Sequence, residues 1–166
     1  MPRNQDRGIA EGGDEVQLVV FRVGGAEFAF NIFQVERVLR HQAPEPLPNA
    51  PEFLEGLLPY GDGVVPVIDL RKRVGAPAPV GDETRIIIVE LDQGRVGVIV
   101  TAVREVLRVP AERVTAPPAL VRGVAAPYIS GVVRVGQRTV VVLAASKLLA
   151  STERIALDEL LVGDKR

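Results

Sequence analysis

Short apolar stretches separated by glycine-containing turns run through most of the chain. Residues 17–23 form an apolar stretch, Gly24 and Gly25 follow it, and residues 26–32 then alternate apolar and polar side chains. Two such stretches joined by two glycines are typical of a tight β-hairpin. The same pattern predicts three more hairpins, which cover residues 53–70, 85–100 and 128–145. Hairpins without a long helix between them favour closed barrels or a sandwich, because both protect strand edges.

The chain also repeats itself. Residues 18–40 align without a gap on residues 86–108, and the two stretches end in the similar words VERVLR and VREVLR. Residues 56–74 align in the same way on residues 131–149, with glycines at matching places. A Val-rich β protein can resemble itself by chance, but here the hairpins and the six-residue words coincide. The repeat predicts two small barrels, each with about five strands.

Composition divides the chain into a core region and two flanking segments. Residues 1–15 are polar and rich in glycine, which predicts a flexible tail, and residues 151–166 predict a short amphipathic helix followed by a tail. The region between them, 16–150, predicts two barrel subdomains of roughly 16–84 and 85–150, and strands could be exchanged between the two.

Charge and residue usage exclude several function classes. The 20 Lys and Arg residues nearly balance the 21 Asp and Glu residues, so the chain lacks the positive field that nucleic-acid binding needs. The absence of cysteine and the presence of one histidine, His41, leave little for metal or redox chemistry, and we expect no cofactor. No apolar stretch is long enough to span or insert into a membrane. A soluble, cytoplasmic protein is the expectation.

The polar residues with candidate chemistry favour structural roles. Asp69 follows an apolar strand and has no second acid nearby, so we predict that it caps a short helix over residues 70–73 rather than acting in catalysis. The basic run in that helix predicts either a solvated face or a contact with an acidic partner. Gly61-Asp62-Gly63 lacks the phosphate-loop pattern and predicts a turn, and His41 is expected to be an ordinary surface residue.

Several apolar residues are candidates for a protein interface. Val35, Val38, Val103 and Val106 occupy equivalent positions in the two repeats. Most such valines belong to a core, but if the halves pack side by side they could line an apolar groove for a partner helix. Phe33 and Phe53 are the remaining candidates for exposed interface anchors.

The order of these stretches resembles the CheW family of chemotaxis coupling proteins, over about residues 17–150. The strongest match is VVPVIDLRKR, residues 64–73. The resemblance implies an all-β fold of two five-stranded SH3-like barrels with short helices and a C-terminal helix. It also implies a non-enzymatic adaptor that couples the regulatory domain of a CheA-type histidine kinase to the cytoplasmic tip of methyl-accepting chemoreceptors, recruited to membrane-associated arrays.

The chain departs from the family pattern at two places that carry charge. Where the family usually has Asn-x-Arg-Gly, this chain has Pro59, Tyr60, Gly61 and Asp62. Arg37 stands where the family is typically acidic. Because charge placement governs partner choice, these departures favour a specialised family member with altered partner surfaces, in chemotaxis or another motility pathway.

Two candidate surfaces follow from the repeat and the resemblance together. The predicted receptor-binding groove contains Val35, Arg37, Val38, Gly56, Gly61, Val103 and Val106. The predicted kinase-binding surface contains Phe53, Pro59, Tyr60 and Asp62. The alternative functions are a small β-barrel enzyme or ligand-binding protein, which would need polar groups inside a barrel, and a structural protein that self-associates through barrel edges.

Overall fold

The computed structural model describes residues 14–92, 94–117, 128–149 and 153. The predicted tail over residues 1–15 and the predicted helix at the C-terminus therefore lie almost entirely outside the described residues. Within them, the chain is nearly all β, as the sequence predicts. No helix in the described part is long and apolar enough to cross a membrane.

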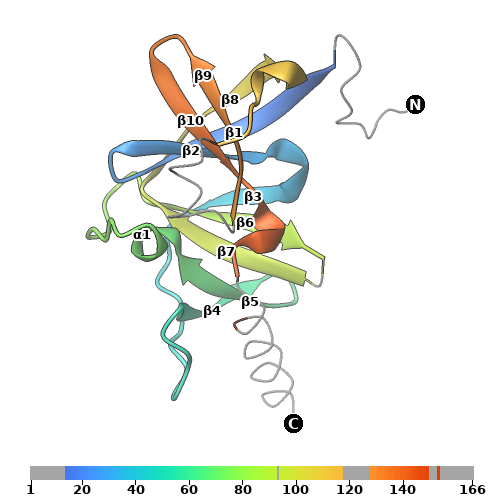
Figure 1. Ribbon diagram of the computed structural model, residues 1–166. Coiled ribbons are helices and arrows are strands. Elements are labelled where there is room, and N and C mark those ends of the chain that lie inside the picture. Colours follow the sequence, from blue (N-terminus) through green and yellow to red (C-terminus); the bar gives the residue numbers. More distant parts are fainter. Residues whose placement is uncertain (1–13, 93, 118–127, 150–152, 154–166) are drawn as a thin grey trace.

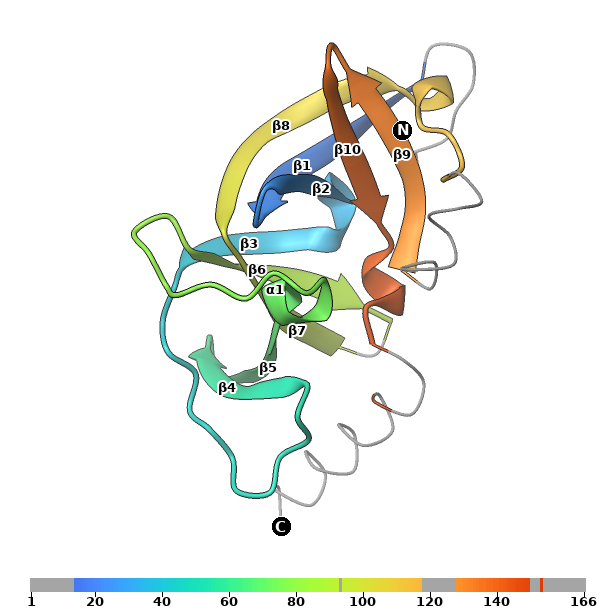
Figure 2. The same cartoon turned by 60° about the vertical axis from the view of Figure 1, so that its left-hand side comes forward.

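The strands form two five-stranded sheets, which lie one above the other in Figures 1 and 2. The first sheet has the order β8-β1-β2-β10-β9, and its strands are β1 (Glu15–Val23), β2 (Ala26–Asn31), β8 (Ala102–Pro110), β9 (Ile129–Val135) and β10 (Arg138–Leu143). The second has the order β3-β6-β7-β5-β4, and its strands are β3 (Val35–Arg40), β4 (Leu54–Tyr60), β5 (Gly63–Asp69), β6 (Arg85–Leu91) and β7 (Gly94–Val100). The predicted all-β fold of two five-stranded barrels is confirmed.

Short helices join or follow the strands. They are η1 (Ile32–Gln34), α1 (Leu70–Arg73), η2 (Ala111–Arg113) and η4 (Ala145–Lys147). Helix α1 follows β5 and η4 follows β10, so each lies at the same point of its repeat. The helix expected over residues 70–73 is therefore present.

The repeat in the sequence is reproduced in the strand register. In the first sheet β2 runs parallel to β10, with Ala29 opposite Val142. At the equivalent position of the second sheet β7 runs parallel to β5, with Gly97 opposite Val67. The β-bulges also match, because β1 and β8 lose register at the same place as β6 and β3. Bulges bend and twist the strands around them, so the two sheets curve alike.

Each sheet combines strands from both repeats. The first sheet contains β1 and β2 from the first half of the chain and its other three strands from the second half. The second sheet contains β3, β4 and β5 from the first half and β6 and β7 from the second. Strand exchange, which the sequence left open, is thus how the barrels are built. Neither barrel consists of one continuous half of the chain.

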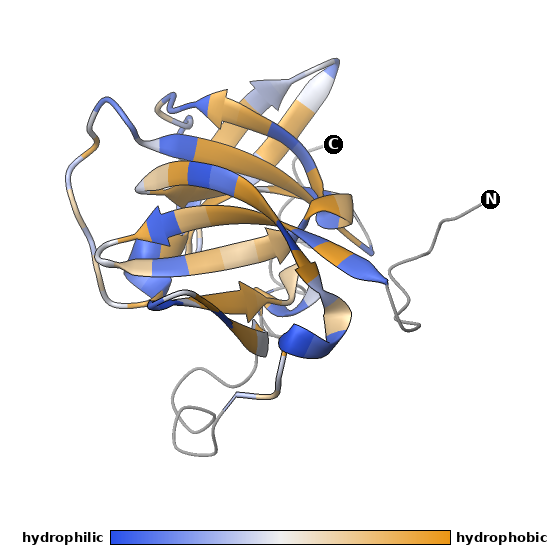
Figure 3. Cartoon of the chain, turned by 90° about the horizontal axis from the view of Figure 1, so that it is seen from above, coloured by the Kyte–Doolittle hydropathy of each residue, from blue (hydrophilic) through white to orange (hydrophobic). Residues whose placement is uncertain are grey.

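Exchange also gives the two barrels a shared core. The largest cluster of buried side chains includes Phe21 and Phe30 from the first sheet and Ile87 and Val98 from the second, all with 0% exposure. The rings of Phe21 and Phe30 pack with centroids 5.0 Å apart. Apolar residues occupy most of both sheets in Figure 3. Burial of each large side chain contributes about 2 kcal/mol, so this cluster fixes the barrels relative to one another.

Candidate functional site

Asp69, at the end of β5, serves the start of helix α1. Its Oδ1 accepts hydrogen bonds from the backbone N–H of Arg71 at 3.0 Å and from the Arg71 Nε at 2.9 Å, and its Oδ2 accepts one from the Arg71 Nη2 at 3.0 Å. The Asp69 and Arg71 side chains are both buried. The hydrogen bond to Asp69 raises the pKa of Arg71 further above its ordinary value. Asp69 is thus a helix cap and half of a buried ion pair.

The three cations of α1 have three different partners, which are Asp69 for Arg71, Glu55 for Lys72 and Glu153 for Arg73. Arg71 turns inward to Asp69, and its Nη1 also donates to the backbone carbonyl of Pro79. Lys72 lies 2.7 Å from a carboxylate oxygen of Glu55. The expectation of a solvated basic face is therefore wrong for Arg71, which is only 4% exposed because the cap residue before it supplies a fixed counter-charge.

His41 is a partly buried surface residue. Its backbone N–H donates to the carbonyl of Thr84, which holds the end of β3 against the start of β6. Burial, and next the nearby Arg71 cation, lower the pKa of His41 below 6.5. Strand pairing draws this loop onto the barrel, so His41 is a surface residue that is only partly exposed.

The four valines of the predicted receptor groove fall into two pairs. Val35 and Val103 are partly buried and pack against the shared core. Val38 and Val106 are 40% and 53% exposed, at equivalent positions of β3 and β8. Both strands lie at the edge of their sheets. Only Val38 and Val106 are thus available to a partner.

Gly56, a predicted groove residue, is buried against another strand segment. A Cβ atom there would lie 2.3 Å from the backbone oxygen of Glu45, and the φ of Gly56 is +152°. Leu57 and Glu45 exchange backbone hydrogen bonds on either side of this contact. The assignment of Gly56 to the groove is therefore wrong, since its role is to let two backbones approach. Gly61 is exposed in the turn between β4 and β5, with φ +58°.

A cluster of three side chains joins the two edge strands of the second sheet. The Tyr60 hydroxyl on β4 donates to Glu36 Oε2 on β3 at 2.6 Å, and the Nε of Arg95 on β7 donates to Glu36 Oε1 at 2.6 Å. These bonds lower the pKa of Glu36 and raise that of Tyr60. Because β3 and β4 are the outer strands, the Tyr60–Glu36 bond closes this end of the barrel.

The same cluster lies between the two predicted partner surfaces. Tyr60, from the kinase set, touches the residue next to Arg37, from the receptor set. Arg37 is exposed and has no ion-pair partner among the described residues. Pro59 and Asp62 are exposed on the same hairpin. At this end of the molecule the structure brings the two predicted sets together.

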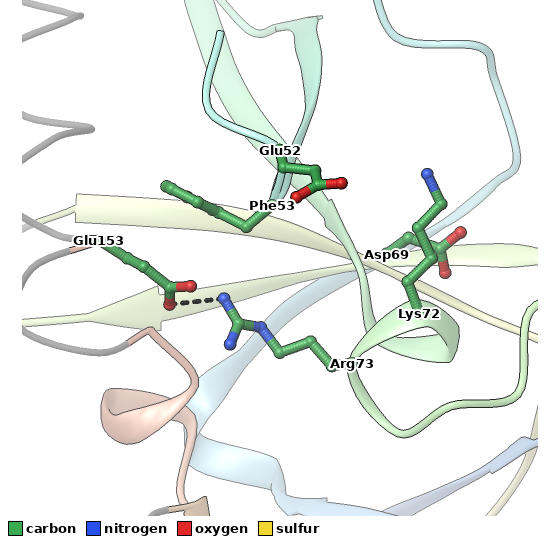
Figure 4. Close-up of a pocket in the computed structure, with 6 residues that line it drawn as sticks. All are labelled: Glu52, Phe53, Asp69, Lys72, Arg73 and Glu153. Atoms are coloured by element: carbon green, nitrogen blue, oxygen red, sulfur yellow. Dashed lines mark hydrogen bonds and ion pairs between the residues drawn. The ribbon is translucent and has the colours of Figure 1, made fainter.

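Phe53 lies apart from the other predicted kinase-binding residues. It precedes β4 while Tyr60 ends that strand, so about 20 Å separates them along an extended strand. Phe53 instead lines a pocket of about 450 Å³ beside α1, drawn in Figure 4. The Arg73 guanidinium lies 6.0 Å from the centroid of its ring and bonds to Glu153. The predicted kinase-binding residues therefore lie at two separate sites on the second barrel.

Sequence reasoning missed the polar residues that close the barrels. Glu36 pairs with Arg95 in the second barrel, and at the equivalent positions of the first barrel Arg104 pairs with Glu27. The repeat alignment already places opposite charges at these positions, so it contained the signal. For metals, the described residues contain no group of three or more His, Cys, Asp or Glu side chains that could hold an ion.

Comparison with known proteins now adds to this geometry. The sequence matches the CheW-like domain over residues 17–153. It is 32% identical over 150 residues to the "Chemotaxis protein CheW" of Treponema pallidum, which covers 87% of this chain and 88% of that protein. The chain belongs to the CheW-like family. It is therefore a CheW-like scaffold protein of chemotaxis and not an enzyme, as the sequence predicts.

Other known proteins match over similar lengths. "Protein FrzA" of Myxococcus xanthus is 30% identical over 156 residues, which is 92% of this chain and 97% of that protein. Among solved structures, the scaffolding protein TtCheW from Thermoanaerobacter tengcongensis superposes with a TM-score of 0.75 at 28% identity. That superposition covers 83% of this chain and 96% of TtCheW. The family thus accounts for the whole two-barrel region.

Proposed function

We propose that this protein couples the regulatory domain of a CheA-type histidine kinase to the cytoplasmic tip of a methyl-accepting chemoreceptor. It acts in the cytoplasm, at membrane-associated receptor arrays, and holds both partners without chemistry of its own. The observation that carries this proposal is the exposure of Val38 and Val106 at equivalent sheet edges of a CheW-like fold. Apolar side chains mark a protein-binding surface when they form one contiguous patch, so the proposal requires Val38 and Val106 to contact the same partner.

The receptor surface is built on the edge strands. Helix η1, directly before β3, carries Phe33, whose side chain is 70% exposed. Leu39 and Leu107, which follow the two valines, point inward to their barrel cores and so hold β3 and β8 in place. A helix with an apolar face can dock on such a surface, and about 800 Å² on each partner is enough for a specific complex.

The charge next to this surface supports a specialised family member. Glu36 is engaged by Tyr60 and Arg95, so the unpaired charge on β3 nearest the hairpin is the cation of Arg37. Gly61 offers no side chain at the turn. A receptor that fits this edge should present a carboxylate toward Arg37, because like charges brought together there would weaken the complex.

The kinase contacts are assigned to the two remaining places. The β4–β5 hairpin presents Pro59 and Asp62, and the Figure 4 pocket presents Phe53. Both belong to the second barrel, whereas the receptor surface uses edges of both barrels. The Phe53 pocket is separate from the receptor surface, whereas the hairpin adjoins it near Arg37, so one rigid molecule would hold the two partners side by side there.

A binding assay with substituted valines tests this division. Val38→Glu and Val106→Glu each place a charge on the proposed receptor surface, and we expect about tenfold weaker binding to a receptor signalling fragment with little change for the kinase regulatory domain. Val80→Glu is the matched control, since Val80 is 54% exposed but lies in a loop. Equal losses for both partners, with folding intact by circular dichroism, would reject the division. Val35→Glu is less suitable because Val35 packs on the core.

A further inference from the structure

The pocket beside α1 is lined mainly by charged side chains. Its lining residues are Glu52, Phe53, Asp69, Lys72, Arg73 and Glu153. Two of these charges are already matched by residues next to the pocket, because Asp69 pairs with Arg71 and Lys72 pairs with Glu55. The Arg73–Glu153 pair is the contact drawn as a dashed line between two lining residues in Figure 4.

Arg73 has more hydrogen-bonding capacity than its contacts use. Its Nη2 donates to Glu153 Oε1 at 2.5 Å. Its Nε is buried and has no acceptor among the described residues. A guanidinium binds a carboxylate best through two parallel N–H groups, so the single contact with Glu153 leaves the preferred geometry unfilled. The two side chains are only 19% and 24% exposed, so Glu153 can leave Arg73 only when another carboxylate takes its place.

The repeat shows that the fold does not require a cation at this position. Arg73 is equivalent to Leu148, which is 1% exposed in the shared core, and Phe53 is equivalent to Tyr128, which packs against that core. Phe53, like Tyr128, packs against the shared core, so the barrels differ at this place in the arginine and not in the aromatic ring. In the second barrel, an arginine stacks on an aromatic ring at the edge of an open pocket.

We propose that Arg73 and Phe53 bind a carboxylate side chain of a partner protein, and that Glu153 competes with it. The partner segment carries Asp or Glu beside an apolar residue, which would pack on the Phe53 ring while the carboxylate takes the place of Glu153. This inference rests on the proposed function, and the partner it names is the kinase regulatory domain. Glu52, exposed at the rim, repels an incoming carboxylate and limits the affinity.

The experiment measures binding of the full chain to two probes. One is the regulatory domain of a CheA-type kinase, and the other is a pair of synthetic peptides that alternate leucine with glutamate or with glutamine. For Arg73→Gln we expect about tenfold weaker binding of the kinase domain and of the glutamate peptide. For Glu153→Gln we expect about threefold tighter binding of both, because the internal competitor is gone.

Matched variants separate this effect from a general loss of charge or folding. Lys72→Gln removes the same charge one residue away, where Glu55 already engages it, and should change binding by less than about twofold. Arg73→Lys keeps the charge but cannot bind a carboxylate in the bidentate geometry of arginine. Its affinity for both probes should lie between those of the wild type and Arg73→Gln. Thermal melts and circular dichroism identify any variant that fails to fold.

The two probes distinguish this inference from the proposed function. If the kinase domain binds the wild type but neither Arg73→Gln nor Glu153→Gln changes its affinity or that of the glutamate peptide, the inference is overturned and the coupling function stands. If the kinase domain does not bind while the glutamate peptide binds through Arg73, the inference stands and the coupling function fails. Equal binding of the two peptides, or binding of neither, overturns the inference.

Discussion

Asp69 in the second barrel and Ala144 in the first occupy the same place, yet only one of them caps a helix with its side chain. Asp69 accepts from the backbone of Arg71 and also pairs with its guanidinium, and α1 follows as an α-helix. Ala144 makes no side-chain cap, and η4 follows as a 3-10 helix. Ala144 instead lines an apolar hollow of about 280 Å³. The same strand arrangement thus tolerates a buried ion pair in one copy and open space in the other.

The ion pairs that involve the outer strands β3 and β8 carry their charges at exchanged positions. Glu36 bonds to Arg95 in the second barrel, and Arg104 bonds to Glu27 at the equivalent positions of the first, with the charges exchanged. In the first barrel Glu27 and Glu105 also share Arg138. Apolar alternation, turns and bulges are therefore common to both barrels, whereas the polar contacts differ between them. Such differences between equivalent positions indicate where partner binding can be encoded.

The buried ion pair gives the largest expected effect on stability. Asp69→Ala leaves the Arg71 cation buried without its partner, and we expect a loss of about 3–5 kcal/mol in the free energy of unfolding, measured in urea. The double variant Asp69→Ala/Arg71→Ser copies the first barrel, which has Ala144 and Ser146 there, and should be more stable than the single variant. A double variant as unstable as Asp69→Ala alone would show that the barrels are not interchangeable at this point.

The two equivalent glycines give the next largest difference. Gly56→Ala would place Cβ 2.3 Å from a backbone oxygen at positive φ, and we expect a loss of about 3 kcal/mol or more. At Gly131 the nearest atom is a side-chain carbon of Val114 at 2.7 Å, so Gly131→Ala should cost about 1–2 kcal/mol. Both values come from urea unfolding curves, and equal losses would refute this reading of the close approach.

Exchange of the outer ion pair should have a smaller effect. Glu36→Arg places two cations together beside Tyr60 and should lower the melting temperature slightly. Adding Arg95→Glu recreates the arrangement of Arg104 and Glu27 and should recover part of the loss. The double-mutant cycle is read from melting temperatures at low salt, where exposed ion pairs are least screened. No recovery in the double variant would mean that Tyr60, rather than Arg95, holds Glu36 in place.

The smallest expected effect is a pH dependence from His41. Burial lowers the pKa of His41 below its ordinary 6.5, so the unfolded chain binds this proton more strongly than the folded chain does. The free energy of unfolding should therefore decrease slightly as the pH falls from about 7.5 to about 5.5. His41→Gln should remove this decrease. A decrease of the same size in His41→Gln would assign it to other groups.

The sequence predicted the fold further than it predicted the site. The repeat of residues 18–40 in 86–108 predicted the hairpins and the two barrels, because alternation and glycine turns are local signals, but it did not predict the matching bulges. Which sheet a strand joins is a non-local choice, so strand exchange stayed open. The role of Gly56 was predicted wrongly because it depends on a tertiary contact, in which the backbone of Glu45 packs against Gly56. Arg73 could not be linked to Phe53 or Glu153 from local spacing.

The central claim is that one rigid molecule holds a receptor and a kinase together. Co-sedimentation tests it most directly, with a receptor signalling fragment displayed on vesicles, the kinase regulatory domain and the full chain. We expect the kinase domain to pellet with the vesicles only when the chain is present, and to pellet less with Val38→Glu. A folded chain that stays in the supernatant, and leaves the kinase domain there too, would contradict it.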